Sequence, residues 1–251
     1  MDLELKGRAA IVTGGSKGIG RAIALGLAAE GANVAVCARG AEALAAVERE
    51  LRERGVKSFA LPCDVADAEL LDHFLEEAHR LLGRVDILVN NASALAFGDD
   101  EAAWLASLQT DVMGAVRATR KVTPWMVEQG GGSIVHISSG SGLEAGSPPA
   151  YAAAKAALIS YSKTTAIALA PNKIRVNVIA PGSIEFPGGV WEQIYTTMRP
   201  TYDSVLATIP SGRMGTDTEV ANAAVFLASA RASWITGVCL GVDGGQRKAN
   251  I

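Results

Sequence analysis

Several features that mark other protein classes are absent from this chain of 251 residues. No apolar run approaches the roughly 20 residues that a membrane-spanning helix needs. The amino-terminal stretch MDLELKGRAAIV lacks the basic segment and following apolar run of a signal peptide. The three cysteines, Cys37, Cys63 and Cys239, are odd in number and far apart, which argues against disulfides or a metal cluster. We therefore expect a cytoplasmic protein without membrane association or metal.

Basic clusters are also absent. The chain has 23 Lys and Arg against 26 Asp and Glu, a net charge of −3, and sequence-independent nucleic-acid binding needs clustered cations to displace counterions. We therefore expect no nucleic-acid partner. The chain does have 49% apolar residues, enough for a sizeable core, and a length that suits one α/β domain. Its three histidines, His73, His79 and His136, lie apart and are interpreted as structural.

Short β-branched runs alternate with longer Ala- and Leu-rich stretches. Continuous apolar runs are typical of strands buried on both faces, and strand–helix alternation implies right-handed crossovers and a parallel sheet. The expected strands are 9–14, 33–37, 57–62, 85–90, 133–138, 174–180 and 237–242. The expected helices lie near 18–30, 41–54, 67–82, 101–128, 150–170 and 217–229. We predict a single Rossmann-type, doubly wound α/β domain over residues 1–251, with seven parallel strands and helices on both faces.

The segment 183–212 interrupts this alternation. It holds three prolines and many large apolar side chains, and it lies between the sixth and seventh expected strands. Two interpretations stay open: a helical insertion packed on the domain, or a lid over an apolar substrate.

A glycine-rich turn, residues 14–20, follows the first expected strand and opens a helix. Glycine is needed where a chain turns tightly or approaches a ligand closely, and a helix amino terminus offers N–H groups to a pyrophosphate. A glycine-rich turn alone also occurs in plain strand–helix connections. Here the strand before it and the helix after it supply the context of the motif, so we predict dinucleotide binding.

The second strand ends at Cys37-Ala38-Arg39, and no acidic residue is present at 37–40. NAD-binding folds usually place an acidic residue near this point to accept from the ribose 2′-hydroxyl. Arg39 can instead pair with a 2′-phosphate, and Lys17 adds a second positive charge. The plainer interpretation is two solvated surface cations. We predict NADP(H) rather than NAD(H).

Tyr151 and Lys155 are four residues apart, which puts both on one face of a helix. A free phenol has a pKa near ~10, and a neighbouring ammonium group favours the phenolate form, so such a pair can move protons at neutral pH. Ser139 follows the fifth strand, at the sheet edge where ligands bind, and can hold a substrate carbonyl. Ser138 competes for this role, because alternation along a strand sends one of the two serines toward the core.

These motifs together resemble the short-chain dehydrogenase/reductase family, and in particular its 3-oxoacyl-(acyl-carrier-protein) reductase-like branch. The resemblance runs from about residue 5 to residue 245. It rests on TGGSKGIG (13–20), CDV (63–65), NNA (90–92), ISS (137–139), YAAAK (151–155), IRVNVIAPG (174–182) and VDGG (242–245).

The resemblance implies a set of cofactor contacts and a homotetramer built on the helices near 101–128 and 150–170. The implied cofactor contacts are Gly14, Ser16, Lys17, Gly18, Ile19, Gly20, Asp64, Val65, Asn90, Ala92, Tyr151, Lys155, Pro181, Gly182 and Ile184.

The chain also departs from the family pattern. Ser93 stands where the family commonly has glycine, Phe186 stands where threonine is frequent, and the serine-to-tyrosine spacing is one residue shorter than usual. Asp111 replaces the asparagine of the family's proton relay. That asparagine holds a water partly through its main-chain carbonyl, a function Asp111 can retain. Alternatively, the Asp111 carboxylate holds the Lys155 ammonium tightly and weakens its effect on Tyr151.

We predict an NADP(H)-dependent oxidoreductase that reduces a ketone or 3-oxoacyl carbonyl to an alcohol, or catalyses the reverse. Ser139 would hold the carbonyl oxygen, Tyr151 would act as acid/base, Lys155 would assist it, and Asp111 completes the catalytic set. The substrate partner would be a small ketone, alcohol or acyl thioester. Two alternatives remain: a dinucleotide-binding sensor or scaffold with little turnover, and an NAD-dependent alcohol dehydrogenase.

Overall fold

Seven parallel strands form the centre of the molecule in the computed structural model, which describes residues 2–248. Their order across the sheet is β3-β2-β1-β4-β5-β6-β9. The chain therefore runs outward from β1 to β3, crosses back, and continues outward from β4. The strands are β1 (Ala9–Thr13), β2 (Asn33–Ala38), β3 (Ser58–Pro62), β4 (Ile87–Asn90), β5 (Gly132–Ile137), β6 (Ile174–Pro181) and β9 (Cys239–Val242). The predicted doubly wound sheet is confirmed.

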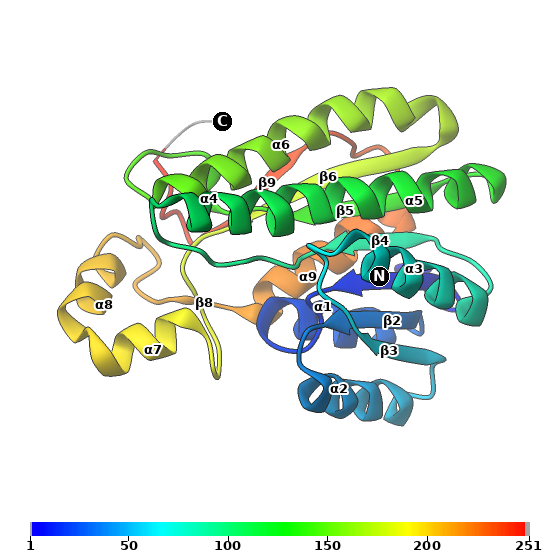
Figure 1. Cartoon of the computed structure of the whole chain (residues 1–251), viewed down its shortest axis with the longest axis horizontal. Helices are drawn as coiled ribbons and strands as arrows, with labels where there is room; N and C mark the ends of the chain where they lie inside the picture. The colour runs from blue at the N-terminus through cyan, green and yellow to red at the C-terminus, as the bar shows by residue number, and fades with distance from the viewer. Residues whose placement is uncertain (1, 249–251) are drawn as a thin grey trace.

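Helices cover both faces of this sheet (Figure 1). One face carries α1 (Gly18–Ala29), α2 (Ala41–Glu53) and α9 (Asp217–Ala228). The other carries α3 (Ala68–Leu82), α5 (Gly114–Glu128) and α6 (Pro149–Leu169). Alternate strand residues supply the two cores: Val12 and Val36 pack on the first face, and Ile11 and Ala35 on the second. This is why the strands read as continuous apolar runs.

The helix expected over 101–128 is present in three pieces. After α4 (Glu101–Ser107) the chain makes a π-helical turn, Leu108–Met113, before α5 begins. The wider turn carries one extra residue, and such bulges occur frequently at functional sites. Here it holds Asp111, which is buried.

The segment 183–212 is mostly helical. A short strand, β7 (Ile184–Glu185), pairs with β8 (Gly215–Thr216), and α7 (Val190–Thr197) and α8 (Arg199–Leu206) lie between them. Figure 1 shows α7 and α8 together at one end of the molecule. They enclose a small apolar cluster of their own, made of Trp191, Ile194, Tyr202, Val205, Leu206, Ile209 and Met214. The segment is thus a helical insertion, and its action as a lid stays a prediction.

Across residues 2–248 no helix combines the length and apolarity that a membrane crossing requires.

Candidate active site

The glycine-rich turn connects β1 to α1. Gly14 has a φ of +65°, and a Cβ there would lie 2.9 Å from the Cα of Ala92. A Cβ on Gly20 would collide with the carbonyl oxygen of Gly14. Lys17 is the N-cap residue of α1 and provides no side-chain cap. The first N–H groups of a helix have no intrahelical partner, so this terminus can accept a phosphate.

Asn91 holds the turn in place. Its Nδ2 donates to the carbonyl oxygens of Thr13 (3.1 Å) and Gly14 (3.0 Å), and its N–H donates to Thr13 Oγ1 (3.1 Å). On the other side, the Gly15 N–H donates to the Cys37 carbonyl at 3.0 Å. Asn91 was not singled out from the sequence, although it lies within NNA (90–92).

Asn90, by contrast, directs its side chain into the core. Its Nδ2 donates to Thr119 Oγ1 (3.3 Å) and lies 3.2 Å from His136 Nδ1. Asn90 is buried, so its side chain supports the packing of β4 against α5 and β5. A cofactor contact by Asn90 stays a prediction.

The residues predicted for the adenosine end of a cofactor meet at the same sheet edge. Arg39 is exposed and lies between β2 and α2, close in the chain to the N-cap of α2. Asp64 and Val65 follow β3; Asp64 Oδ1 accepts from the Ala66 N–H at 3.0 Å, and Val65 is buried. Because β1, β2 and β3 are parallel neighbours, their carboxyl ends bring Lys17, Arg39 and Asp64 to one edge.

The end of β5 is tied to α6 through Lys155. Its Nζ donates to the Ile137 carbonyl (3.1 Å), and Ser138 Oγ donates to the Lys155 carbonyl (2.9 Å). Ser138 is therefore the serine that faces the core. Ser139 is only partly buried, and its Oγ accepts from the Ser141 N–H at 3.1 Å.

Tyr151 and Lys155 lie in the first turns of α6, which has proline at its amino terminus. Lys155 Nζ is 5.6 Å from the centre of the Tyr151 ring. The Phe97 ring meets Tyr151 edge to face with a centroid separation of 5.3 Å. Sequence reasoning missed Phe97, because a single aromatic residue in the loop after β4 belongs to no periodic pattern.

The Lys155 ammonium forms an ion pair with Asp111, with Nζ 2.8 Å from Oδ1, and both side chains are almost fully buried. Asp111 Oδ2 accepts from the Ala94 N–H at 2.9 Å. Burial alone lowers the pKa of Lys155, but the charges of Asp111 and Tyr151 and the hydrogen bond to Asp111 outweigh it, so the pKa is raised above its ordinary value. Burial, followed by the Lys155 charge, lowers the pKa of His136 to about 3, so this ring is neutral.

The residues predicted to flank a nicotinamide follow β6. Pro181 ends that strand, and the Gly182 N–H donates to the Val242 carbonyl at 3.0 Å. Ile184 is buried in β7. The Phe186 ring packs directly on Gly18, where an added Cβ would collide with it. Phe186 therefore joins the insertion 183–212 to the glycine-rich turn.

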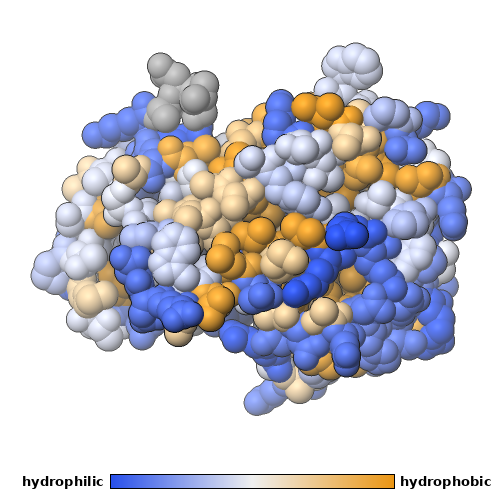
Figure 2. Space-filling view, turned by 45° about the horizontal axis from the view of Figure 1, so that its top comes forward, coloured by the Kyte–Doolittle hydropathy of each residue, from blue (hydrophilic) through white to orange (hydrophobic). Residues whose placement is uncertain are grey.

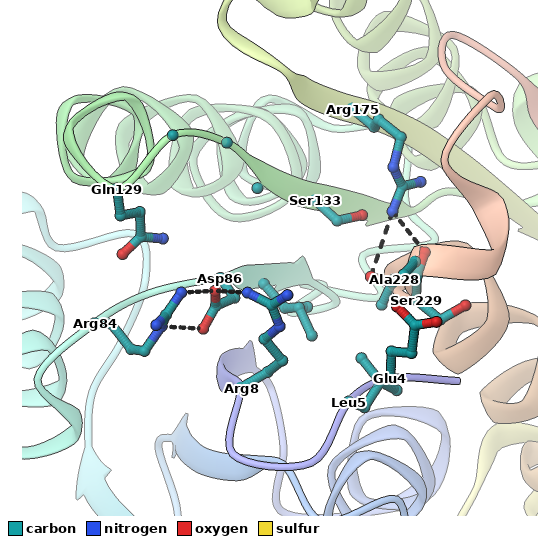
Figure 3. A pocket seen from close by; sticks show the side chains of 15 residues that line it. Glu4, Leu5, Arg8, Arg84, Asp86, Gln129, Ser133, Arg175, Ala228 and Ser229 are labelled. Atoms are coloured by element: carbon teal, nitrogen blue, oxygen red, sulfur yellow. Dashed lines mark hydrogen bonds and ion pairs between the residues drawn. The ribbon is translucent and has the colours of Figure 1, made fainter. Parts of the chain in front are cut away.

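A separate pocket of about 240 Å³ contains none of the predicted site residues (Figure 3). In it Asp86 accepts from Arg8 Nη1 (3.1 Å) and Arg84 Nε (2.7 Å). Arg175 Nη1 donates to the Leu227 carbonyl near the end of α9 at 2.7 Å. Asp86 and Ser133 mark the amino-terminal ends of β4 and β5, opposite Tyr151, and the arginines there serve structural pairs.

Comparisons with known proteins agree with this geometry. Residues 14–247 match the family described as Enoyl-(Acyl carrier protein) reductase. The chain is 39% identical over 245 residues to the 3-oxoacyl-[acyl-carrier-protein] reductase FabG of Staphylococcus epidermidis, covering 95% of this chain and 98% of the relative.

The fold is also similar to those of solved oxidoreductase structures. L-sorbose reductase from Gluconobacter frateurii, complexed with NADPH and L-sorbose, superposes with a TM-score of 0.90 at 35% identity, covering 99% of this chain and 100% of that one. A 7α-hydroxysteroid dehydrogenase complexed with NADH and 7-oxo glycochenodeoxycholic acid gives 0.90 at 34% identity, covering 97% and 96%. The resemblance drawn from the motifs is confirmed: the chain is an oxidoreductase that belongs to the short-chain dehydrogenase/reductase family.

Proposed function

We propose that this enzyme interconverts a ketone or 3-oxoacyl carbonyl and the corresponding alcohol, with NADP(H) as cofactor and Tyr151 as acid/base. The observation that carries the proposal is the anchoring of Lys155 beside Tyr151. Its ammonium is fixed by the Ile137 carbonyl and by Asp111, 5.6 Å from the centre of the Tyr151 ring, at the end of β5, where Ser139 lies in the following loop. A fixed cation beside a phenol at a ligand-binding sheet edge suits proton transfer.

The residues at this edge fit a nicotinamide dinucleotide, which members of the family bind. The uncapped amino terminus of α1 and the close approach of Gly14 to Ala92 leave backbone N–H groups and little side-chain bulk for a pyrophosphate. Arg39 and Lys17 would hold a 2′-phosphate. The bound cofactor would supply the hydride. The remaining proposed contacts are Ser16, Gly18, Ile19, Gly20, Asp64, Val65, Asn90, Ala92, Tyr151, Lys155, Pro181, Gly182 and Ile184.

In the direction of reduction, Ser139 Oγ would donate to the carbonyl oxygen and orient the carbonyl. The carbonyl oxygen would take the proton of the Tyr151 hydroxyl as the carbonyl carbon is reduced. Lys155 would stabilise the resulting phenolate, which regains a proton from solvent. In alcohol oxidation the same groups act in the reverse order.

The surroundings of Tyr151 favour an apolar substrate. Phe97 contacts its ring. The insertion 183–212, which follows β6, carries Phe186 and an apolar cluster of its own that includes Trp191 and Tyr202. We propose that this insertion acts as a lid and that the substrate is a hydrophobic ketone or an acyl thioester.

We also propose a homotetramer that uses the α4–α6 side of the molecule. Leu105, Leu108, Val127 and Ile167 expose large apolar side chains there. Figure 2, which turns that side forward, shows apolar patches interrupting the polar surface. Apolar patches of this kind are typical of contacts between subunits.

Replacement of Tyr151 by phenylalanine tests the chemistry. The variant keeps the ring and removes the transferable proton, so we expect kcat to fall by roughly 10²–10⁴-fold while NADPH affinity stays within about twofold of wild type. NADPH fluorescence titration measures binding, and NADPH absorbance measures turnover on a ketone panel that includes acetoacetyl thioesters. Turnover close to that of wild type would exclude Tyr151 as the proton donor.

A dinucleotide sensor with little turnover is the second candidate, and the Asp111–Lys155 ion pair favours it, because a neutralised Lys155 supports Tyr151 less. The same panel distinguishes the two functions. Tight NADPH binding with no oxidation of NADPH on any ketone, even at high enzyme concentration, would support the sensor.

A further inference from the structure

The Lys155 ammonium contacts the Ile137 carbonyl and the Asp111 carboxylate, and of these two partners only Asp111 is charged. We propose that Asp111 is a positioning residue that neutralises Lys155 and thereby keeps Tyr151 in its protonated form, the form that carbonyl reduction uses, to higher pH. The inference rests on the proposed role of Tyr151 and adds the residue that sets its pH range.

The contact between the two charges is direct. The 2.8 Å separation of Lys155 Nζ and Asp111 Oδ1 leaves no room for a water between them, and the exposed fractions of the two side chains are 3% and 0%. Asp111 is fixed at its other oxygen by the Ala94 N–H and in its backbone by the π-helical turn. The carboxylate therefore cannot swing away from Lys155 without loss of its hydrogen bond from the Ala94 N–H.

The negative charge of Asp111 weakens the electrostatic effect of Lys155 on Tyr151. Seen from the tyrosine, an isolated ammonium is a full positive charge, but an ammonium paired with a carboxylate is a dipole whose field falls off faster with distance. The phenolate is stabilised less by the pair than by the ammonium alone. With an uncharged residue at position 111, the buried cation would lack a counter-charge, and the Tyr151 hydroxyl would be the neighbouring group able to provide one.

The other titratable groups on the elements packed here do not alter this argument. His136, from β5, is neutral because burial and Lys155 lower its pKa to about 3. Tyr161, on α6, contacts the His136 ring, and burial raises its pKa. Glu144, on the loop after β5, is exposed and accepts from the Lys248 N–H. Within residues 2–248, Asp111 is the buried carboxylate paired with Lys155.

The experiment follows the ring of Tyr151 without requiring turnover. Tyrosine labelled with ¹³C at Cζ gives one NMR signal for each of the four tyrosines, and Tyr151→Phe identifies the signal of Tyr151. We expect Asp111→Asn to move the titration midpoint of this signal to lower pH by roughly 1–2 units, from the loss of one negative charge a few ångströms beyond Lys155. A midpoint that is unchanged within about 0.3 units, or that rises, overturns the proposal.

Three further variants separate the effect of charge from an effect on structure. Asp86→Asn removes another buried carboxylate, paired with Arg8 and Arg84 at the opposite end of the sheet; it should lower Tm and leave the Tyr151 midpoint unchanged. If Asp111→Asn fails to fold, Asp111→Ser also removes the charge and has a smaller side chain. We expect it to move the Tyr151 midpoint to lower pH in the same way. Asp111→Glu keeps the charge and should keep the wild-type midpoint.

The pH profile of turnover supplies the second measurement. With NADP⁺ and the alcohol product of the best ketone from the panel, the pH of half-maximal oxidation should fall in Asp111→Asn by the same interval as the NMR midpoint. If no ketone is reduced by wild type, the proposed function fails, but the NMR titration still decides whether Asp111 controls Tyr151.

Discussion

At the scale of single residues, we expect Arg39 to be the charge on which cofactor selectivity depends. It is exposed at the carboxyl end of β2, and residues 37–40 contain no acidic side chain that could accept from a ribose hydroxyl. A charge-assisted hydrogen bond to phosphate contributes roughly 1.5–3 kcal/mol. We therefore expect Arg39→Ala to weaken NADPH binding by roughly tenfold or more and to leave NADH binding nearly unchanged, as measured by fluorescence titration of both cofactors.

Arg49→Ala provides the control for that experiment. Arg49 is an exposed arginine on α2, two turns beyond the helix amino terminus, and its removal changes net charge equally. Its NADPH affinity should stay near wild type. Equal NADPH affinities in the two variants, together with tighter binding of NADH than NADPH by wild type, would favour the NAD-dependent alternative.

Single residues also mark the limit of sequence reasoning. Alternation along β5 predicted that either Ser138 or Ser139 would face the core, but it did not show which. The hydrogen bond from Ser138 Oγ to the Lys155 carbonyl identifies Ser138 as the inward-facing serine. Asn90 and Asn91 form a similar pair: adjacent in sequence, they point to the core and to the glycine-rich turn, respectively. The motifs identified which short segments matter, whereas tertiary contacts decide what each neighbouring side chain does.

At the scale of elements, the insertion 183–212 contacts the glycine-rich turn through Phe186. The aromatic ring packs on Gly18, which has a φ of +50° and no side chain of its own. We expect Phe186→Thr to strengthen NADPH binding by about three- to tenfold, because it uncovers the turn and restores a hydroxyl where the family frequently has one. A hydrogen bond contributes about 1 kcal/mol, a factor of about five. Fluorescence titration measures the change.

Phe186→Val separates the two causes in that prediction. Valine matches threonine in shape but has no hydroxyl, so equal gains in both variants would assign the effect to removal of the ring. A gain in threonine alone would assign it to the hydrogen bond. Weaker binding in both variants would mean that the ring itself supports the cofactor.

The strands and long helices were predictable because burial on both faces leaves continuous apolar runs, and Ala-rich stretches separate them. The interruption of the helix expected over 101–128 was not predictable. A π-helical turn adds one residue without changing composition, and its benefit, the inward placement of Asp111 against Lys155, involves a helix some 40 residues later in the chain. The pairing of β7 with β8 was also not predictable, because strands of two residues are too short to show an alternating sequence pattern.

At the scale of the whole molecule, we expect the exposed apolar side chains of α4–α6 to be covered by another subunit of the proposed homotetramer. Ile167 on α6 is 69% exposed, and Trp234 is 99% exposed on a loop that Lys163 ties to α6 through the Gly237 carbonyl at 3.1 Å. Buried against another subunit, side chains of this size contribute roughly 1.5–3 kcal/mol each. Light scattering after size exclusion should therefore give wild type a mass about four times the 25.9 kDa of one chain.

A charge introduced into that surface should dissociate the assembly. Ile167→Glu would bury an unpaired carboxylate in an apolar contact, so we expect smaller species at micromolar concentrations. Leu70→Glu is the matched control, because Leu70 is also an exposed apolar residue, 47% accessible, but lies on α3 outside this surface. It should keep the wild-type mass. A monomeric wild type, or identical masses for all three proteins, would show that subunits do not associate through α6 and would leave the exposed side chains of α4–α6 available for other partners.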